Sequence, residues 1–346
     1  MARNRVHQVL CAAGRYDAIT TQALAFRRRF ERWGWGGSDH AAQIDPGLDD
    51  DIRSLATLSA AASDVVLIHY SGYVPGLEAL ARRSGRTLLV YHNITPPRWF
   101  WAYDSGVALH CALGREQLAE IARAVDVAAG VSEFNAGELR AAGAPAASVL
   151  PILFDRDRLP QPAADPPAGP PRVLFVGRLA PHKRQDDVIR AFELYRRRHA
   201  PDARLTLVGE PLSPAFGARI RDLADELAPG AVEIEERVDA AELWECYRSA
   251  HAFLCLSEHE GFCIPLLEAF HFGVPVVARA AAGIPETSGD AALLADDDDL
   301  AVFAELLHVA AGDDGLRAEL RRRGDARLEC FDAERTAELL RAAVTG

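Results

Sequence analysis

Two glutamates eight residues apart are the residues best placed to do chemistry in this chain. Glu260 follows an apolar run at 252–256 that predicts a buried strand, and Glu268 lies about one turn into the helix predicted next. In open α/β sheets, ligands bind outside the carboxyl ends of the strands. Gly261 lets a ligand approach the backbone, and N–H groups at a helix start favour anions. The alternative is a solvated loop glutamate and a favourable first-turn charge.

A cationic loop is the second candidate for chemistry. The predicted strand 173–176 ends at Gly177, and Arg178 and Lys183 follow on one loop before a helix expected to begin near Gln185. Fixed cations and helix N–H groups aimed at an anionic group stabilise negative charge that develops on it. The alternative is that both are surface charges on a strand-to-helix loop.

The elements that must position these residues alternate between strand and helix patterns. Short, continuously apolar strands with helices between them are typical of parallel sheets covered on both faces. The sequence therefore predicts an α/β protein with two Rossmann-like, doubly wound domains. Strands are expected at 6–11, 65–68, 87–91, 127–131, 173–176, 205–208, 232–234, 252–256 and 274–278, and helices at 20–32, 115–123 and 332–345 among others.

A proline-rich stretch at 159–171 separates the two halves. It holds six prolines, so neither a helix nor a central strand can run through it, and a stiff linker is expected. We therefore divide the chain into a first domain at 1–158, the linker at 159–171, a second domain at 172–330 and a final helix within 331–346.

Composition excludes several classes of protein. The chain has 346 residues, 49% of them hydrophobic, and a net charge of −12, which disfavours nucleic acid as the main partner. No apolar stretch approaches membrane-spanning length. The six cysteines show no metal-type C-x2-C pair, so reduced, buried residues of a cytoplasmic protein are expected. Without a G-x-G-x-x-G after a strand or a Walker-type loop, a nicotinamide dehydrogenase or P-loop NTPase is disfavoured.

The segment 257–269 resembles the E-x7-E signature of family 4, the large family of retaining glycosyltransferases with the GT-B architecture. It carries both glutamates at that spacing, with the Gly-Phe, Pro and Glu-Ala positions. The runs 273–278 and 283–286 match the same family, and Gly177 to Lys183 matches its G-R-x4-K pyrophosphate loop. The resemblance implies two domains that face a cleft, the first on the acceptor side and the second holding the donor. It also implies that the final helix packs back on the first domain.

The resemblance implies a role for each donor-side residue. Arg178 and Lys183, beside Gly177, would hold the diphosphate and stabilise its departure. Glu268 would accept hydrogen bonds from the ribose hydroxyls. Glu260 would hold hydroxyls of the transferred sugar, with the backbone N–H groups of Gly261 and Phe262 orienting that sugar.

Three further positions match the family less closely. Val238 lies in a loop where the family's backbone meets the nucleobase, although Glu236 stands in place of the usual glycine. His92, in an H-N-I-T-P string at a strand end, would contact the transferred sugar, whereas a lone histidine is more often structural. Thr20 stands where relatives commonly have glycine; Thr20 or Thr21 would either offer hydroxyl groups to the donor or cap the next helix.

Two charged clusters allow a functional and a structural interpretation. The aspartates at 296–299 resemble a metal-binding D-x-D, but an N-cap at Asp299 is favoured and no metal is expected. The basic, aromatic helix end at 26–35 could contact an anionic membrane, although a solvated face with buried aromatics is favoured. Ser132 is expected to be an N-cap.

The sequence thus favours a retaining, metal-independent hexosyltransferase that needs no cofactor. Its partners would be a UDP- or GDP-linked sugar and a hydroxyl of a glycan, a lipid-linked glycan or a small molecule. A cytoplasmic location is expected, with peripheral contact at the inner face of the membrane left open, as is the oligomeric state. The alternatives are a nucleotide-sugar hydrolase or epimerase of the same fold, and an inactive nucleotide-sugar-binding partner in polysaccharide assembly.

Overall fold

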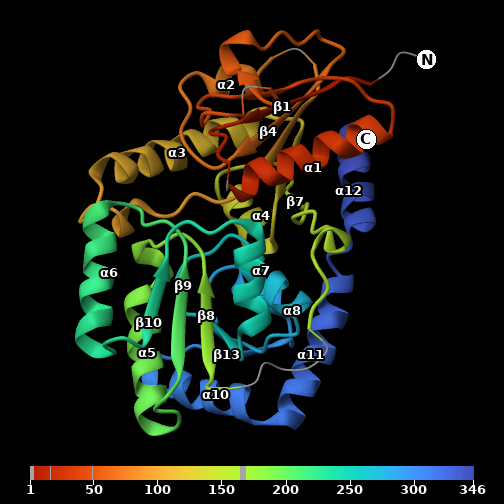
Figure 1. The fold of residues 1–346 in the computed structure, drawn as a ribbon. Helices are drawn as coiled ribbons and strands as arrows, with labels where there is room; N and C mark the ends of the chain where they lie inside the picture. Colours follow the sequence, from red (N-terminus) through yellow and green to blue (C-terminus); the bar gives the residue numbers. More distant parts are fainter. Residues whose placement is uncertain (1–3, 16, 49, 84, 164–168) are drawn as a thin grey trace. The chain divides into compact units, whose positions relative to one another are not determined.

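The computed structural model describes residues 4–15, 17–48, 50–83, 85–163 and 169–346 (Figure 1). The chain divides into two compact units. Unit 1 comprises Met1–Arg98, Gly106–Phe154 and Phe331–Gly346, and unit 2 comprises Trp99–Ser105 and Asp155–Cys330. Of the expected linker at 159–171, residues 164–168 lie outside the described residues.

Unit 1 is built on a sheet whose paired strands all run parallel, in the order β3-β2-β1-β4-β5-β6-β7. The central strands β1 and β5 are buried along their whole length, as continuous apolar sequence predicts. The short strands β2, β3 and β7 were not predicted. The strands are β1 (Val6–Leu10), β2 (Asp39–Ala41), β3 (Arg53–Ser54), β4 (Val65–Tyr70), β5 (Thr87–Tyr91), β6 (Val127–Gly130) and β7 (Ser148–Val149).

The helices of unit 1 include the last one of the chain, α12. Its Glu334 pairs with Arg29 on α1, and Arg86 donates from Nη2 to the carbonyl of Ala343 at 3.0 Å. These contacts hold a segment from the end of the sequence against the first domain. The helices of this unit are α1 (Ala18–Arg32), α2 (Leu77–Ala81), α3 (Ser105–Ala124), α4 (Glu133–Ala141) and α12 (Ala333–Thr345).

Unit 2 is built on a second parallel sheet, in the order β10-β9-β8-β11-β12-β13. The chain leaves β8 toward one edge through β9 and β10 and then returns to β11 on the other side of β8. The neighbours β8 and β11 therefore form the point where strand order reverses, and ligands bind at such points. The strands are β8 (Arg172–Val176), β9 (Arg204–Val208), β10 (Val232–Glu235), β11 (Ala252–Cys255), β12 (Val276–Arg279) and β13 (Ala292–Ala295).

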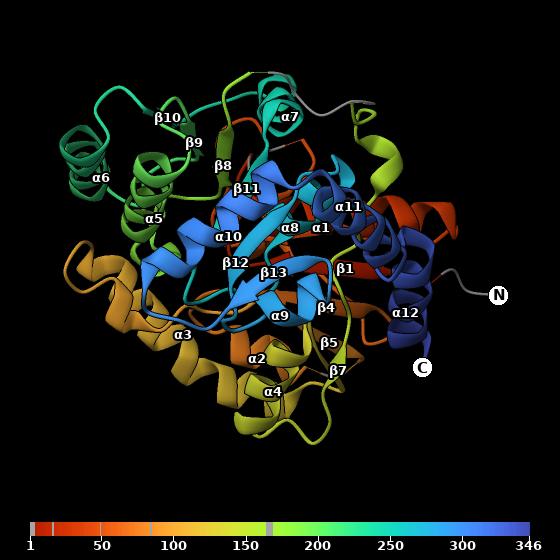
Figure 2. The same ribbon diagram turned by 90° about the horizontal axis from the view of Figure 1, so that it is seen from below.

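Helices α6, α5 and α10 lie in one row against this sheet, with α5 between the other two (Figure 2). Their buried side chains join those of the strands in one apolar core that includes Phe175, Phe192 and Phe303. Each such side chain contributes roughly 1.5–3 kcal/mol on burial. The helices are α5 (Gln185–Arg198), α6 (Pro214–Leu227), α7 (Ala240–Ser249), α8 (Ile264–His271), α9 (Ile284–Ser288), α10 (Leu300–Gly312) and α11 (Asp314–Glu329).

The helix caps expected at Ser132 and Asp299 are confirmed, and the alternative that Thr20 or Thr21 caps the first helix is wrong. Ser132, Asp239 and Asp299 each accept a backbone hydrogen bond at the start of a helix. For α1 the cap is Asp17, whose carboxylate accepts from the Thr20 N–H, so neither Thr20 nor Thr21 is the N-cap. The helix begins earlier than predicted because a carboxylate was available there.

The cysteines are all free, as expected, but not all are buried. Cys330 is exposed, and Cys111 and Cys246 are partly exposed. Cys330 directly follows the last turn of α11, at 314–329, and faces solvent. Within the described ranges, no helix is long and apolar enough to cross a membrane.

Candidate functional site

Lys183 and Glu260 meet at the switch point of the second sheet. Lys183 ends the short 3-10 turn at Pro181–Lys183 after β8, and Glu260 lies on the loop after β11. Because β8 and β11 are parallel neighbours, their loops leave the same sheet edge. The Lys183 Nζ lies 2.5 Å from the Glu260 Oε1, and the two side chains are only 17% and 11% exposed. Ser257 donates its hydroxyl to the same carboxylate oxygen at 3.0 Å.

Lys183 is the only lysine in the chain. Burial, the largest single influence, opposes its charged form, but the charge and hydrogen bond of Glu260 act with the nearby Cys263 and Cys255 thiols, and the pKa of Lys183 is raised. It therefore carries a full positive charge at neutral pH. A compact ammonium differs from a planar guanidinium in the space and hydrogen-bond geometry that it needs, and every other basic side chain except histidine is an arginine.

Arg178 lies on the same loop and is exposed. Within the part of the chain that the structure describes, its guanidinium makes no hydrogen bond or ion pair. The loop backbone is fixed beneath it, because Gln185 accepts from the Ala180 N–H at 3.2 Å and donates to the Arg178 carbonyl at 3.0 Å. Gly177 has a φ of +149°, a conformation that L side chains rarely adopt. The loop thus presents Lys183, which is paired with Glu260, and Arg178, which is exposed to solvent.

The loop that carries Glu260 is fixed from the following turn. The Gly283 N–H donates to the Glu260 carbonyl at 3.0 Å, and the Thr287 hydroxyl donates to the Phe262 carbonyl at 2.5 Å. A Cβ on Gly283 would lie 2.6 Å from the Gly261 carbonyl oxygen. The downstream Gly-Ile-Pro-Glu run therefore fixes the position of the backbone around Glu260.

Glu268 lies further along α8 and interacts with a residue that the sequence analysis did not single out. Tyr247, on α7, donates its hydroxyl to the Glu268 Oε2 at 2.6 Å. Burial raises the pKa of Glu268, and the hydrogen bond from Tyr247 opposes this effect only in part. No sequence signal marks Tyr247, because its contact with Glu268 joins two helices.

Val238 is half-buried on the loop between β10 and α7. Its neighbours Glu236 and Arg237 pair with Arg221 and Glu210 respectively, and Asp239 forms a capping box with Glu242. The loop is held by side chains on both sides of Val238. The glutamate that stands in place of glycine is thus accommodated by an exposed ion pair.

His92 in unit 1 ends a chain of buried polar side chains. Gln8 donates from Nε2 to the Asp39 Oδ1 at 2.8 Å and to the Ala23 carbonyl at 2.9 Å. Its Oε1 lies 2.9 Å from the His69 Nε2, and the His69 Nδ1 lies 3.0 Å from the His92 Nε2. Because the Gln8 Nε2 has two acceptors, the orientation of the amide is fixed. The direction of the hydrogen bonds that follow it is then fixed as well.

The hydrogen bonds from Gln8 through His69 determine the tautomer of His92. The Gln8 Oε1 can only accept, so the His69 Nε2 carries the proton. Burial and the adjacent imidazole lower the pKa of His69 well below its usual value, and burial lowers the pKa of His92 to about 3, so both rings are neutral at pH 7. The His69 Nδ1 must therefore accept from the His92 Nε2. The remaining nitrogen of His92, Nδ1, is left as an acceptor.

Thr20 is buried, and its hydroxyl is used within its own loop. It accepts from the Gly14 N–H at 3.0 Å and donates to the Asp17 Oδ2 at 3.0 Å. The Thr20 hydroxyl therefore stabilises the first strand-to-helix loop. A nearby Asp in the sequence is the signal that could have predicted this use.

The two charged clusters support the structural interpretation. Asp299 caps α10, Asp297 accepts from the Asp299 N–H at 2.8 Å, and Asp298 pairs with Arg279. In the basic helix end, Arg27 lies 2.6 Å from Asp39, and Arg29 pairs with Glu334. Two of the three arginines that could have faced a membrane are thus turned toward acidic partners of their own domain.

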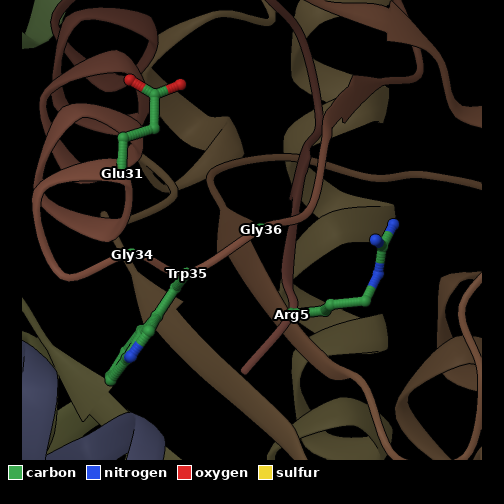
Figure 3. A pocket seen from close by; sticks show the side chains of 5 residues that line it. All are labelled: Arg5, Glu31, Gly34, Trp35 and Gly36. Carbon is green, nitrogen blue, oxygen red and sulfur yellow. The ribbon is translucent and has the colours of Figure 1, made fainter. Parts of the chain in front are cut away.

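A surface hollow of about 470 Å³ lies beside the C-terminal end of α1 (Figure 3). It is lined by Arg5, Glu31, Gly34, Trp35 and Gly36, and its two charged side chains do not converge. Arg5 lies 3.8 Å from Asp64. This hollow does not assemble a set of polar groups comparable with those around Lys183 and Glu260.

Comparison with known proteins finds a family model and relatives that match the second domain. The model of the family "Glycosyl transferases group 1" matches residues 160–327, which include Arg178, Lys183, Glu260 and Glu268. O-antigen chain mannosyltransferase B of Escherichia coli is 29% identical over 171 residues, covering 47% of this chain and 42% of that protein. D-inositol 3-phosphate glycosyltransferase of Acidothermus cellulolyticus is 34% identical over 174 residues, covering 48% and 39%. The chain thus spans less than half the length of these two relatives.

A longer match extends into the first domain. The GDP-mannose-dependent alpha-(1-6)-phosphatidylinositol monomannoside mannosyltransferase of Mycolicibacterium smegmatis is 32% identical over 231 residues, covering 61% of this chain and 57% of that protein. Among solved structures, Anabaena Alr3699/HepE in complex with UDP and glucose has a TM-score of 0.75 at 16% identity and covers 98% of this chain and 99% of its own. Sucrose-phosphate synthase from Thermosynechococcus elongatus has a TM-score of 0.74 at 17% identity, covering 98% and 97%.

The structural likenesses are too low in identity to show more than the fold, and they extend over both domains. The family match covers the residues that the resemblance singled out in the second domain. The glycosyl transferases group 1 model thus matches just under half of the chain, at residues 160–327, and the two Rossmann-like domains share the GT-B fold of the solved structures.

Proposed function

We propose that the protein is a retaining glycosyltransferase that transfers a hexose from a nucleotide-diphosphate sugar to an acceptor hydroxyl. The observation that carries this proposal is the Lys183–Glu260 pair at the switch point of the donor-domain sheet. A single lysine and an adjacent solvent-facing Arg178 supply two positive charges where a diphosphate is expected. A carboxylate beside them supplies an acceptor for sugar hydroxyls.

In this proposal the donor enters a site in which the charge of Lys183 is already paired with that of Glu260. The diphosphate interacts with Arg178 and Lys183, so that Lys183 shares its three N–H donors between phosphate oxygen and Glu260. Glu260 then accepts hydrogen bonds from the transferred sugar. As the glycosidic bond breaks, the two cations stabilise the departing diphosphate without a metal ion.

Other residues orient the two ends of the donor. Glu268, held by Tyr247, accepts from the ribose hydroxyls, and the backbone beside Val238 meets the base. The acceptor nitrogen of His92 takes a hydrogen bond from a sugar hydroxyl. The acceptor oxygen bonds to the anomeric carbon on the face that the diphosphate leaves, so the anomeric configuration is retained, and the hydroxyl proton passes to the departing phosphate oxygen. Gly261 and Phe262 orient the sugar through their backbone N–H groups, as the family resemblance implies.

The donor is a UDP- or GDP-linked sugar, and the names of the relatives include both nucleotides. A thermal-shift panel of UDP, GDP and ADP with their sugars identifies the base, because a ligand that binds only the folded state raises the unfolding temperature. Products are then analysed with each bound donor. A new glycoside supports the proposal, whereas free sugar indicates a hydrolase, an altered sugar an epimerase, and no turnover with any acceptor an inactive binding partner.

Substitutions test the assignment of residues. Arg178→Ala and Glu260→Ala are each expected to lower transfer at least tenfold while the protein remains folded. Arg219→Ala and Glu226→Ala are matched controls, because both side chains are exposed on α6 and outside the proposed site. Full activity in both site variants, or equal loss in the controls, contradicts the assignment.

A further inference from the structure

Two buried thiols lie against the proposed donor site. Cys255 is the last residue of β11, and Cys263 precedes the first residue of α8. Their Sγ atoms are 4.0 Å apart, and both residues are buried, at 1% and 8% exposure. A carboxylate oxygen of Glu260 completes a triangle in which every ligand atom lies within 4.8 Å of the others. We call Cys255, Cys263 and Glu260 the thiol–carboxylate cluster.

We propose that the thiol–carboxylate cluster binds one thiophilic divalent cation, of which Zn²⁺ is the type. Both sulfurs and one oxygen of Glu260 are the protein ligands, and a solvent molecule takes the fourth position. Sulfur ligands select zinc over the hard cations Mg²⁺ and Ca²⁺, which prefer oxygen. The binding site goes beyond the proposed transfer activity and does not depend on it.

The separation of the two sulfurs is close to that of a tetrahedral zinc site. With Zn–S bonds of about 2.3 Å and tetrahedral angles, two sulfur ligands lie about 3.8 Å apart. With a Zn–O bond of about 2.1 Å, sulfur and oxygen lie about 3.6 Å apart, and here the Glu260 oxygen lies within 4.8 Å of both sulfurs. The two thiols of this chain are therefore within a few tenths of an ångström of the required separation before any ion is bound.

The backbone at Cys263 supports a role for its side chain. Its φ of +73° lies in the left-handed region, which glycine adopts without strain and other residues adopt at a cost. Strained residues of this kind gather at ligand sites. A cysteine here costs backbone energy and contributes a thiol 4.0 Å from a second one.

The charges also balance when the ion is bound. Each thiol loses its proton to solvent, so two thiolates and the Glu260 carboxylate supply three negative charges. One Zn²⁺ and the adjacent Lys183 ammonium supply three positive charges. Ser257, whose hydroxyl lies 3.4 Å from the Cys255 Sγ and 3.0 Å from the Glu260 Oε1, can hydrogen-bond the fourth ligand.

Binding has a consequence for the donor site, and this consequence alone rests on the proposed function. An ion on Glu260 withdraws the carboxylate that is proposed to hold the transferred sugar. Zinc and donor are therefore expected to compete. Zinc bound by a protein that has no transfer activity would still confirm the metal site.

The test is a calorimetric titration of the reduced, metal-free full chain with ZnCl₂ alone, with MgCl₂ as comparison. One zinc per chain is expected, with no measurable heat from magnesium. Cys255→Ser and Cys263→Ser are each expected to weaken zinc binding at least tenfold. Cys330→Ser is the matched control, because Cys330 is exposed and outside the cluster, and its affinity is expected to equal that of the wild type.

A second measurement needs no variant, in case the serine substitutions unfold the chain. X-ray absorption of the zinc-loaded wild type is expected to report two sulfur ligands at about 2.3 Å. The proposal is overturned if the wild type binds no stoichiometric zinc, if the bound ion has no sulfur ligands, or if folded variants of both cluster cysteines keep wild-type affinity.

Discussion

Removing one partner of the Lys183–Glu260 pair tests how strongly the two charges depend on each other. The substitutions are Lys183→Met, which keeps the length of the side chain, Glu260→Gln, and the two together. At 2.5 Å and an effective dielectric constant of 20, the gross attraction is about 7 kcal/mol. Desolvation of the two ions, which retain only 17% and 11% exposure, offsets much of it.

Breaking a buried pair from one side costs roughly 3–5 kcal/mol, because it leaves an uncompensated charge. Because the pair keeps some exposure, Lys183→Met is expected to lower the free energy of unfolding by about 3 kcal/mol, the lower end of this range. Glu260→Gln is expected to lower it by about 2 kcal/mol, since the flexible lysine can then turn toward water. The double variant is expected to lose about 3 kcal/mol instead of the sum of about 5. The coupling energy is then about 2 kcal/mol.

The assay is urea unfolding of the four proteins, with the free energy taken from the transition of the second domain. Arg190→Met is the control, because Arg190 is 39% exposed and pairs with Asp186 on the helix surface, and its loss is expected to stay below about 1 kcal/mol. Additivity of the two site substitutions within about 0.5 kcal/mol would refute the reasoning. So would an unchanged stability of Lys183→Met.

Three further predictions follow from the geometry. Burial raises the pKa of Glu268 above its value in the unfolded chain. The wild type should therefore gain stability relative to Glu268→Gln as the pH falls through the raised pKa toward the usual value. A difference in urea midpoints that stays constant with pH argues against this. Nitrogen-15 NMR of the wild type should find the proton of His92 on Nε2 and none on Nδ1 at pH 6–8. The Gln8→Leu variant should show a mixture of the two tautomers. An Nδ1 proton in the wild type contradicts the chain of hydrogen bonds. Gly283→Ala should displace the loop through its clash with the Gly261 carbonyl and weaken donor binding at least tenfold, and unchanged binding by calorimetry would show that the loop tolerates it.

The strand positions were largely predictable, because central parallel strands are apolar along their length. The predicted strands at 87–91 and 173–176 agree with Thr87–Tyr91 and Arg172–Val176 to within one residue. The strand predicted at 274–278 lies at Val276–Arg279, since Pro275 precedes it and Arg279 continues it. The strands at 39–41, 53–54, 148–149 and 292–295 were missed because each is only two to four residues long, whereas the edge strand at 232–235 was predicted.

The candidate residues of the second domain were also visible in sequence, but their pairing was not. Gly177 to Lys183 and Glu260 to Glu268 are local patterns, each complete within a dozen residues. The contact between Lys183 and Glu260 joins residues 77 positions apart and depends on β8 and β11 being neighbours. Tyr247 beside Glu268 depends in the same way on how two helices pack.

The sequence by itself determined the fold class, the family signature and the chemical types at the candidate site, because these depend on local periodicity and on spacing along the chain. Only the tertiary structure decided which partners these residues have. It placed the lone lysine on Glu260, used the Thr20 hydroxyl within its own loop, left one nitrogen of His92 as an acceptor, and brought Cys255 to 4.0 Å from Cys263. The physical reason is that hydrogen bonds and ion pairs act over a few ångströms in space, whatever the distance along the chain.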